Sequence, residues 1–373
     1  MKFSAQDHNM MARALQLAGK ACYTTAPNPA VGCVILSNNK IIGEGFPRPA
    51  GGNHAEIEAL QMAGDVPGCT VYVTLEPCSH QGKTGPCVQA LIKAKVSRVI
   101  VATEDPNPKV SGSGIKQLQD AGIEVEVGLM EAQARELNKG FFKRVTEGNP
   151  WVLVKMAASL DGRTAMASGQ SQWITTPAAR LDVQRLRAAS CAIITGIGTQ
   201  QMDNPALTLR ITAEELGVED PLQQPMRVVV DAQMQMSADA RILQAPGLCV
   251  IATLDKPQQR ENSKALVAAG AEVIFLPAQD EHVDLRALLE VLAQRDCNQV
   301  MVEAGAGLAG AFIAEGLLDE LVCYWAPKLF GSQARPMFDL PIDTIDAHLA
   351  LSVKDMRMVG EDIKLTMQPD KDY

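Results

Sequence analysis

The chain has 373 residues, more than one hydrophobic core usually organises, so two domains are expected. A net charge of −9, an aromatic fraction of only 4% and the absence of a lysine- or arginine-rich run disfavour a nucleic-acid-binding protein. No stretch has the apolar length of a membrane span, and the first residues do not resemble a secretory signal. Nine scattered cysteines, an odd number, favour reduced thiols and hence a cytoplasmic protein.

Short apolar segments alternate with amphipathic ones, a pattern that predicts an α/β fold. In the first part, the expected strands are 31–36, 41–45, 71–75, 98–102 and 123–127, and the expected helices are 7–18, 55–63, 88–95, 115–121 and 132–144. The turn 37–40 predicts an antiparallel hairpin between the first two strands. The later strands each follow a helix, which favours parallel pairing.

A polar stretch at 146–150 ends in Pro150 and predicts a boundary between domains 1–149 and 150–373. After it, the expected strands are 151–156, 192–195, 227–230, 249–252, 272–276, 300–303, 321–326, 349–358 and 363–367, and the expected helices are 178–188, 263–269, 285–294 and 308–315. The last two strands have no helix between them, which predicts a closing antiparallel hairpin.

His54, Glu56, Cys78 and Cys87 form the strongest chemical pattern. One imidazole and two thiolates suit a catalytic zinc that keeps an open position for water, and the glutamate is then free to move protons. Both helix starts at this site favour thiolate over thiol. His80 is a rival ligand in the loop between the cysteines. The alternative is that the cysteines are only small buried residues.

In the second part, Gly305–Gly310 follows an expected strand and opens an expected helix, as a phosphate-binding loop does. It stands too late in its domain for a Rossmann fingerprint, and it could instead only cap the helix. Polar residues and glycine turns at other strand ends indicate a site built from several loops. These segments are 155–163, 171–175, 196–199 and 203–210, with Arg187. Simple turns, and a core position for Trp173, are the alternatives.

The first part resembles the zinc-dependent cytidine deaminase superfamily, through H-A-E, P-C and a second cysteine. Eight residues separate Cys78 from Cys87, and this long gap resembles the branch that deaminates a pyrimidine in riboflavin biosynthesis. The segment Pro27–Gly32 strengthens the resemblance, which implies that Asn28 binds substrate, although P-N-P could equally be a rigid turn. The resemblance also implies one zinc ion per chain, Glu56 as the catalytic proton carrier, and a 5-phosphate on the substrate. His80 and Lys83 could contact that phosphate or be solvated.

The second part resembles the reductase half of the bifunctional riboflavin-biosynthesis enzymes, whose fold is like that of dihydrofolate reductase. The resemblance implies NADPH as the cofactor, and Lys155 as a catalytic residue that polarises the reacting sugar. The implied NADPH contacts are Ala158, Trp173, Thr199, Asp203, Gly305, Ala306, Gly307, Leu308, Ala309, Gly310 and Ala311. The implied contacts of the phosphoribosyl substrate are Ser171, Arg187, Leu207, Arg210 and Glu303.

Together the two resemblances imply deamination of 2,5-diamino-6-(5-phosphoribosylamino)pyrimidin-4(3H)-one, followed by reduction to 5-amino-6-(5-phosphoribitylamino)uracil. They also imply a homo-oligomer that acts on a small molecule, without nucleic acid or membrane. Two other classes stay open on the residues alone. One is a nucleic-acid deaminase with a binding module, and the other is a zinc-stabilised regulatory protein whose second domain senses a nucleotide.

Overall fold

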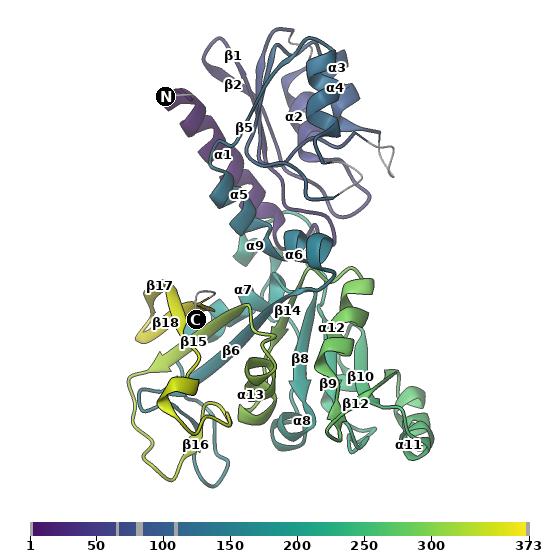
Figure 1. Ribbon diagram of the computed structural model, residues 1–373, viewed down its shortest axis with the longest axis vertical. Helices are drawn as coiled ribbons and strands as arrows, with labels where there is room; N and C mark the ends of the chain where they lie inside the picture. The colour runs from purple at the N-terminus through teal and green to yellow at the C-terminus, as the bar shows by residue number, and fades with distance from the viewer. Residues whose placement is uncertain (1–2, 65–66, 80–84, 108–110, 371–373) are drawn as a thin grey trace. The chain divides into compact units, whose positions relative to one another are not determined.

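The computed structural model describes residues 3–64, 67–79, 85–107 and 111–370, and Figure 1 labels most of their helices and strands. The chain divides into two compact units. The first unit comprises Met1–Gly148 and Thr212–Leu222, and the second comprises Asn149–Ile211 and Gln223–Tyr373. Within the described ranges, no helix combines the length and apolar character needed to cross a membrane.

The first unit has a five-stranded sheet in the order β2-β1-β3-β4-β5. Its strands are β1 (Cys33–Ser37), β2 (Lys40–Gly45), β3 (Thr70–Val73), β4 (Arg98–Val101) and β5 (Glu124–Val127). The predicted β1–β2 hairpin and the parallel pairing of β3, β4 and β5 are confirmed. β3 also pairs antiparallel with β1, because the helix between β2 and β3 carries the chain past β1.

Helices cover both faces of this sheet, which gives α/β/α layers and agrees with the predicted α/β fold. The helices of the first unit are α1 (Ala5–Ala21), α2 (Ala55–Ala63), α3 (Cys87–Lys93), α4 (Ser113–Asp120), α5 (Glu131–Leu137), α6 (Lys139–Glu147) and α9 (Ala213–Leu216). Apolar residues of α2, α3 and α4 pack on one face, and those of α1 and α5 on the other. A single helix at 132–144 was wrong, because Asn138 interrupts it with a φ of −113°. The Asn138 side chain exchanges two 2.8 Å hydrogen bonds with the backbone of Ala30.

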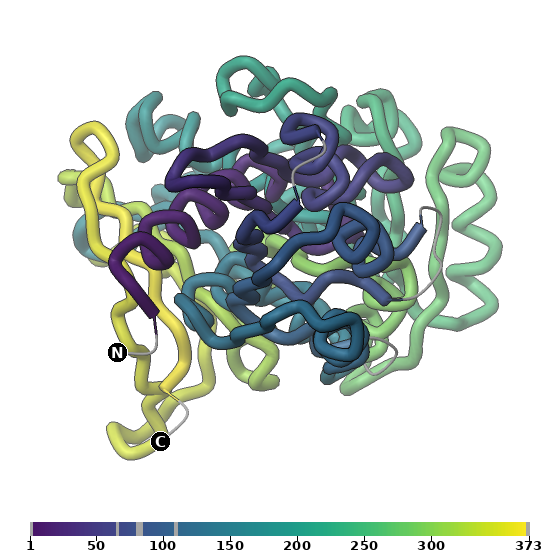
Figure 2. Tube along the Cα trace, turned by 90° about the horizontal axis from the view of Figure 1, so that it is seen from above, coloured from purple at the N-terminus to yellow at the C-terminus, as the bar shows by residue number. Residues whose placement is uncertain are grey.

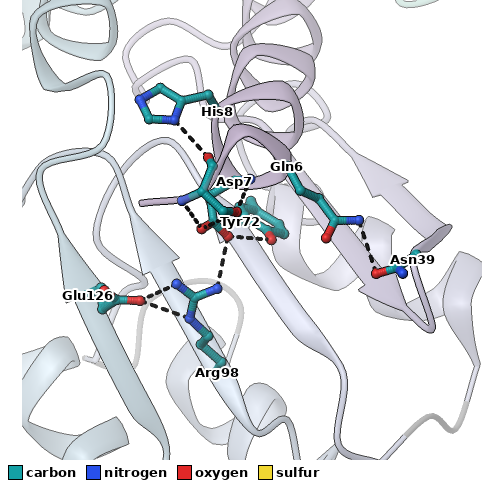
Figure 3. A network of polar contacts seen from close by, with 8 residues as sticks. Gln6, Asp7, His8, Asn39, Tyr72, Arg98 and Glu126 are labelled. Carbon is teal, nitrogen blue, oxygen red and sulfur yellow. Dashed lines mark hydrogen bonds and ion pairs between the residues drawn. The ribbon is translucent and has the colours of Figure 1, made fainter. Parts of the chain in front are cut away.

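Asp7, near the start of α1, ties this helix to the sheet (Figure 3). Its carboxylate accepts hydrogen bonds of 2.9 Å from the Tyr72 hydroxyl and from Arg98, which also pairs with Glu126. Burial alone raises the pKa of Asp7, but hydrogen bonds from Ser4, Arg98 and Tyr72 outweigh it and lower the pKa to about 2.

The second unit has a nine-stranded sheet in the order β11-β10-β9-β8-β14-β6-β15-β18-β17. Its strands are β6 (Trp151–Ser159), β8 (Ala192–Gly196), β9 (Met226–Val230), β10 (Cys249–Leu254), β11 (Glu272–Leu276), β14 (Gln299–Val302), β15 (Glu320–Ala326), β17 (Leu351–Val359) and β18 (Asp362–Pro369). Two small ribbons pair β7 (Arg163–Ala165) with β16 (Arg335–Pro336), and β12 (Ala278–Gln279) with β13 (His282–Val283). The predicted closing hairpin is confirmed as β17–β18, which is yellow in Figure 2.

Six helices accompany these strands in the described residues of the second unit. They are α7 (Pro177–Ala188), α8 (Ile197–Asp203), α10 (Arg241–Gln244), α11 (Pro257–Ala268), α12 (Leu285–Gln294) and α13 (Ala306–Ala314). Three differ from the sequence prediction, and one of them, α10, was not expected at all. α8 was read as a glycine turn, and α11 begins six residues earlier than expected, with Pro257 in its first turn, where a missing N–H costs nothing. Separate apolar clusters fill the two faces of the sheet.

Candidate active sites

His54, Cys78 and Cys87 come together in the first unit from two helix starts and one strand end. His54 is the N-cap of α2, Cys87 is the first residue of α3, and Cys78 follows β3. The Nδ1 atom of His54 lies 3.5 Å from the Sγ of Cys78 and 3.3 Å from the Sγ of Cys87. Two ligands of one tetrahedral zinc ion are about 3.6 Å apart when one is nitrogen and the other sulfur. The three atoms therefore have the spacing that zinc requires.

The thiols of Cys78 and Cys87 differ in how readily each loses its proton. Hydrogen bonds from Cys87, and then from His54, lower the pKa of Cys78 to about 4 although burial opposes this. The Cys87 N–H also donates to the Cys78 sulfur at 3.3 Å. The same contact and burial raise the pKa of Cys87. A thiolate is thus already favoured at one position, as a metal ligand must be, and three protein ligands leave the fourth position for a reactant.

Glu56 lies on the first turn of α2, two residues after the ligand His54, and is 4% exposed. Burial, reinforced by the charge of Cys78, raises the pKa of its carboxyl group to about 7. Such a group exchanges protons readily near neutral pH, which suits a general acid and base. It is not one of the three grouped ligand residues.

The other predicted residues of the first unit are less well defined by contacts. Asn28 is half-buried in the turn before β1, and its N–H donates to the Thr25 carbonyl at 2.8 Å. His80 was a rival zinc ligand, and His80 and Lys83 were candidate phosphate contacts. Both residues lie outside the described residues.

Glu76, two residues before Cys78, is a structural residue of this site that sequence reasoning missed. Its buried carboxylate accepts hydrogen bonds of 2.9–3.2 Å from the backbone N–H groups of Asp105, Gly112, Gly114 and Ile115. It thereby fixes Asp105 and the start of α4 beside the strand end that carries Cys78. A charged residue directly after a buried strand was the available signal.

In the second unit, a cavity of about 1390 Å³ opens at the carboxyl ends of the parallel strands. Ten predicted site residues line it: Lys155, Ser171, Thr199, Asp203, Glu303, Gly305, Ala306, Gly307, Leu308 and Ala311. Strand ends of a parallel sheet are where α/β proteins bind nucleotides.

Lys155 and Glu303 form the charged floor of this cavity, together with Arg187 behind them. Lys155 Nζ lies 3.8 Å from Glu303, and Arg187 donates two hydrogen bonds of 2.9 and 3.0 Å to the same carboxylate. Burial raises the pKa of Glu303, but the charges of Arg187 and Lys155 prevail and lower it. Burial lowers the pKa of Lys155. One carboxylate thus balances two cations next to a space for substrate.

The start of α13 is suited to the phosphates of NADPH. Its N-cap, Gly305, has no side-chain cap, so the N–H groups of the first turn remain for a ligand. The Gly305 N–H itself donates to the Thr199 hydroxyl at 3.1 Å. A Cβ at Gly307 would meet no atom within 4 Å, so that position opens onto space. The residues present fit a dinucleotide in this cavity.

Seven predicted site residues do not line the cavity. Ala158 and Ala309 are fully buried, Leu207 belongs to an apolar cluster, and a Cβ at Gly310 would lie 2.0 Å from the carbonyl oxygen of Asp339. Trp173 is 60% exposed, which removes the alternative that it is a core residue. Arg187 is buried and contacts the cavity-lining Glu303, whereas Arg210 is exposed. Burial and then the charge of Arg187 lower the pKa of Arg210.

Sequence reasoning also missed part of the cavity wall. Met202, His282, Arg335 and Asp339 line it from α8, the β12–β13 ribbon and the segment after β15. Arg335 donates to the sulfur of Met202 at 3.1 Å, and the Asp339 N–H donates to the carbonyl of Ala306 on α13. The irregular segments around these residues carry no periodic signal.

Comparisons with known proteins match both units. The model of the cytidine and deoxycytidylate deaminase zinc-binding region matches residues 4–103, and that of the RibD C-terminal domain matches residues 150–365. The riboflavin biosynthesis protein RibD of Escherichia coli K12 is 47% identical over 367 residues, which cover 96% of this chain and 98% of that protein. The RibD protein of Haemophilus influenzae is 44% identical over 99% of both chains.

Solved structures agree. One form of Acinetobacter baumannii RibD has a TM-score of 0.88 and 42% identity, and covers 98% of this chain and 99% of its own. A Thermotoga maritima structure described as a diaminohydroxyphosphoribosylaminopyrimidine deaminase and 5-amino-6-(5-phosphoribosylamino)uracil reductase has a TM-score of 0.86 and 30% identity, with the same coverage. The chain therefore belongs to the RibD family of riboflavin biosynthesis proteins, as a bifunctional enzyme with a zinc-dependent deaminase and an NADPH-dependent, dihydrofolate-reductase-like domain.

Proposed function

We propose that the chain deaminates 2,5-diamino-6-(5-phosphoribosylamino)pyrimidin-4(3H)-one and then reduces the product to 5-amino-6-(5-phosphoribitylamino)uracil. The deaminase is assigned to residues 1–149 and the reductase to residues 150–373. The observation that carries the first step is the grouping of His54, Cys78 and Cys87 beside the buried Glu56. The similarity to the Thermotoga maritima deaminase and reductase supports both substrates.

In the deaminase, His54, Cys78 and Cys87 would hold a zinc ion, which would supply Lewis-acid activation of water. Glu56 accepts a proton from that water and passes protons to the ring nitrogen and to the departing amino group. Its burial keeps the carboxyl group poised between its two protonation states. Ammonia leaves and a carbonyl replaces the amino group. Asn28 is assigned to hydrogen bonding with the substrate.

In the reductase, the cavity holds the sugar next to Lys155. Opening of the ribosyl ring gives an imine whose carbon takes up a hydride and whose nitrogen takes up a proton. NADPH supplies that hydride when it is bound. Lys155 polarises the reacting sugar, and Glu303 fixes the position and charge of Lys155. Ser171, Arg187, Leu207 and Arg210 are assigned to the phosphoribosyl group, since arginine pairs phosphate oxygens two at a time. The NADPH contacts are assigned as the resemblance implies.

We also propose that the enzyme acts in the cytoplasm as a homo-oligomer. β17 is an edge strand of the nine-stranded sheet, and its Val353, Met356 and Met358 are each at least 60% exposed. An exposed apolar edge strand favours pairing with another chain. Light scattering of the purified protein measures this, and a monomeric mass across micromolar concentrations contradicts it.

The proposed reactions are tested with the diaminopyrimidinone ribosyl phosphate, with and without NADPH. Ammonia release is expected in both conditions, whereas NADPH oxidation should require prior or simultaneous deamination. Glu56→Gln is expected to stop ammonia release but not reduction of supplied deaminated substrate. Lys155→Ala is expected to do the reverse. Loss of both activities in either folded variant contradicts the division of labour.

A further inference from the structure

Four consecutive residues beside the reductase cavity are each held by a charged side chain from elsewhere in the second unit. The carbonyls of Trp173 and Ile174 accept hydrogen bonds from the Lys328 ammonium at 3.1 and 2.6 Å. The carbonyl of Thr175 accepts one from Arg180 at 2.6 Å. Thr176 donates its N–H and its hydroxyl to Asp362, at 2.8 and 2.5 Å. We call residues 173–176 the clamped segment.

Lys328 reaches this segment from a firmly fixed backbone. It follows β15, whose last residue, Ala326, pairs with Ser159 at the end of β6. The Lys328 N–H donates to Ala326 at 2.7 Å, and its carbonyl accepts from Leu160 at 2.8 Å. Just beyond it, the carboxylate of Asp161 accepts hydrogen bonds from the next turn of the chain. The ammonium group is therefore presented from the central sheet.

The other two contacts fix the end of the segment but not its beginning. Asp362 is fully buried and, within the clamped segment, accepts hydrogen bonds from Thr176, the N-cap of α7. Arg180 holds Thr175 from α7, and its guanidinium lies 4.3 Å from the Trp173 ring. Lys328 is thus the charged side chain that holds the backbone of both Trp173 and Ile174. Hydrogen bonds from a charged donor are stronger than neutral ones.

Ser171 and Ile174 line the cavity, so the clamped segment and the residues just before it form part of its wall. Ile174 is 8% exposed and is packed in place, whereas the Trp173 ring is 60% exposed. A shift of these two carbonyls would move the wall on which Ser171 is carried.

We propose that Lys328 is a positioning residue for the reductase reaction, which holds the carbonyls of Trp173 and Ile174 so that the Ser171–Ile174 wall is preformed for NADPH and the phosphoribosyl substrate. This inference rests on the proposed reductase function. Lys328 acts through the wall and is not itself a contact of the reacting atoms.

The test compares the full-length wild type with Lys328→Met, Lys328→Arg and a control, Lys264→Met. Methionine keeps the length of the side chain without its donors, and arginine keeps the charge and can donate to both carbonyls. Lys264 is an exposed lysine on α11 that pairs with Glu261 and is not among the residues that line the cavity. Three quantities are measured: amide hydrogen exchange of peptides that span 171–176, the NADPH dissociation constant by titration, and steady-state kinetics of both activities.

In Lys328→Met, exchange in the clamped segment is expected to rise about tenfold, and NADPH is expected to bind about tenfold more weakly, which equals about 1.4 kcal/mol. KM should change more than kcat, and ammonia release should not change. Lys328→Arg should recover most of the binding, and Lys264→Met should match the wild type. Faster exchange with unchanged NADPH and substrate binding overturns the proposal, because Lys328 then has only a structural role. Unchanged exchange also overturns it. A wild type that neither binds nor oxidises NADPH instead contradicts the proposed function.

Discussion

Arg187 and Glu303 meet in a two-point ion pair at the wall of the reductase cavity, which Glu303 lines, and Lys155 approaches the same carboxylate. Arg187 also donates to the carbonyl of Thr208 at 2.9 Å. The Glu303 carboxylate therefore pairs with two cations that have different roles. Arg187 fixes the loop that leads to Arg210, and Lys155 is presented to the reacting sugar.

Replacement of Glu303 by glutamine is expected to impair reduction and to destabilise the second unit. Glu303 raises the pKa of Lys155 against the effect of burial, so its loss lowers that pKa further. The basic limb of the reductase pH profile should then move to lower pH. Loss of one partner of a buried pair costs about 3–5 kcal/mol. The pH dependence of kcat/KM and thermal unfolding measure the two effects, and an unshifted basic limb argues against a charged Lys155 in the reaction.

Replacement of Glu56 by glutamine should lower deaminase kcat by about 10²–10⁴-fold, because the amide cannot carry protons. Zinc content should stay at one ion per chain, since His54, Cys78 and Cys87 are untouched. Metal analysis and ammonia release measure this. A variant that loses zinc together with activity would show that Glu56 is needed to hold the metal.

Removal of the zinc ion should abolish the deaminase activity but not the reductase activity. Cys87→Ser, or a chelator, is expected to abolish zinc binding and ammonia release while NADPH-dependent reduction of supplied substrate persists. Cys69→Ser is the matched control, because Cys69 is equally buried but is not part of the triad. If reduction falls in parallel with zinc, the two activities are not independent.

Asp7 should make the first unit sensitive to acid. Its pKa falls from 3.8 to about 2 on folding, so the ionised form stabilises the fold above pH 4 by about 2 kcal/mol, and this is lost as pH falls toward 2. The stability gap between the wild type and Asp7→Asn should therefore be constant above pH 5 and close below pH 4. Asp120→Asn, at an exposed position on α4, is the control. Thermal melts across this range test it, and a gap independent of pH contradicts the assignment.

Two glycines of α13 should respond in opposite ways to alanine. At Gly310 the new Cβ would lie 2.0 Å from the Asp339 carbonyl oxygen, so Gly310→Ala is expected to destabilise by about 1–3 kcal/mol. At Gly307 the Cβ meets open space in the cavity wall, and alanine favours the helix by up to about 1 kcal/mol. Gly307→Ala should thus melt no lower than the wild type but bind NADPH more weakly. Equal melting points for Gly310→Ala and Gly307→Ala would contradict the expected difference in packing at the two positions.

The sequence was informative where one local pattern decides the geometry. His54, Cys78 and Cys87 each stand at the edge of a periodic segment, so their elements could be placed and their convergence expected. Alternation of apolar segments likewise predicted most strands of both sheets within two or three residues.

The remainder depends on contacts between distant segments. Asn138 breaks a helix because of Ala30, and α8 forms where two glycines indicated a turn. Arg335 and Asp339 reach the cavity from an irregular stretch, and the clamp on Trp173 requires Lys328, 155 residues further along the chain. Neither periodicity nor short motifs carry such information.

The segment Thr212–Leu222 belongs to the first unit although both of its neighbours belong to the second. Its Glu219 and Asp220 pair with Arg48, at 3.4 and 3.6 Å. The polypeptide therefore crosses between units three times, at 148–149, 211–212 and 222–223. A single cut after Gly148 would remove Thr212–Leu222 from the deaminase unit to which it belongs. The same segment would stay attached to the reductase without the residues that it contacts. We therefore expect that an engineered separation of the two activities also needs Thr212–Leu222 to be deleted or replaced, in addition to a cut after Gly148.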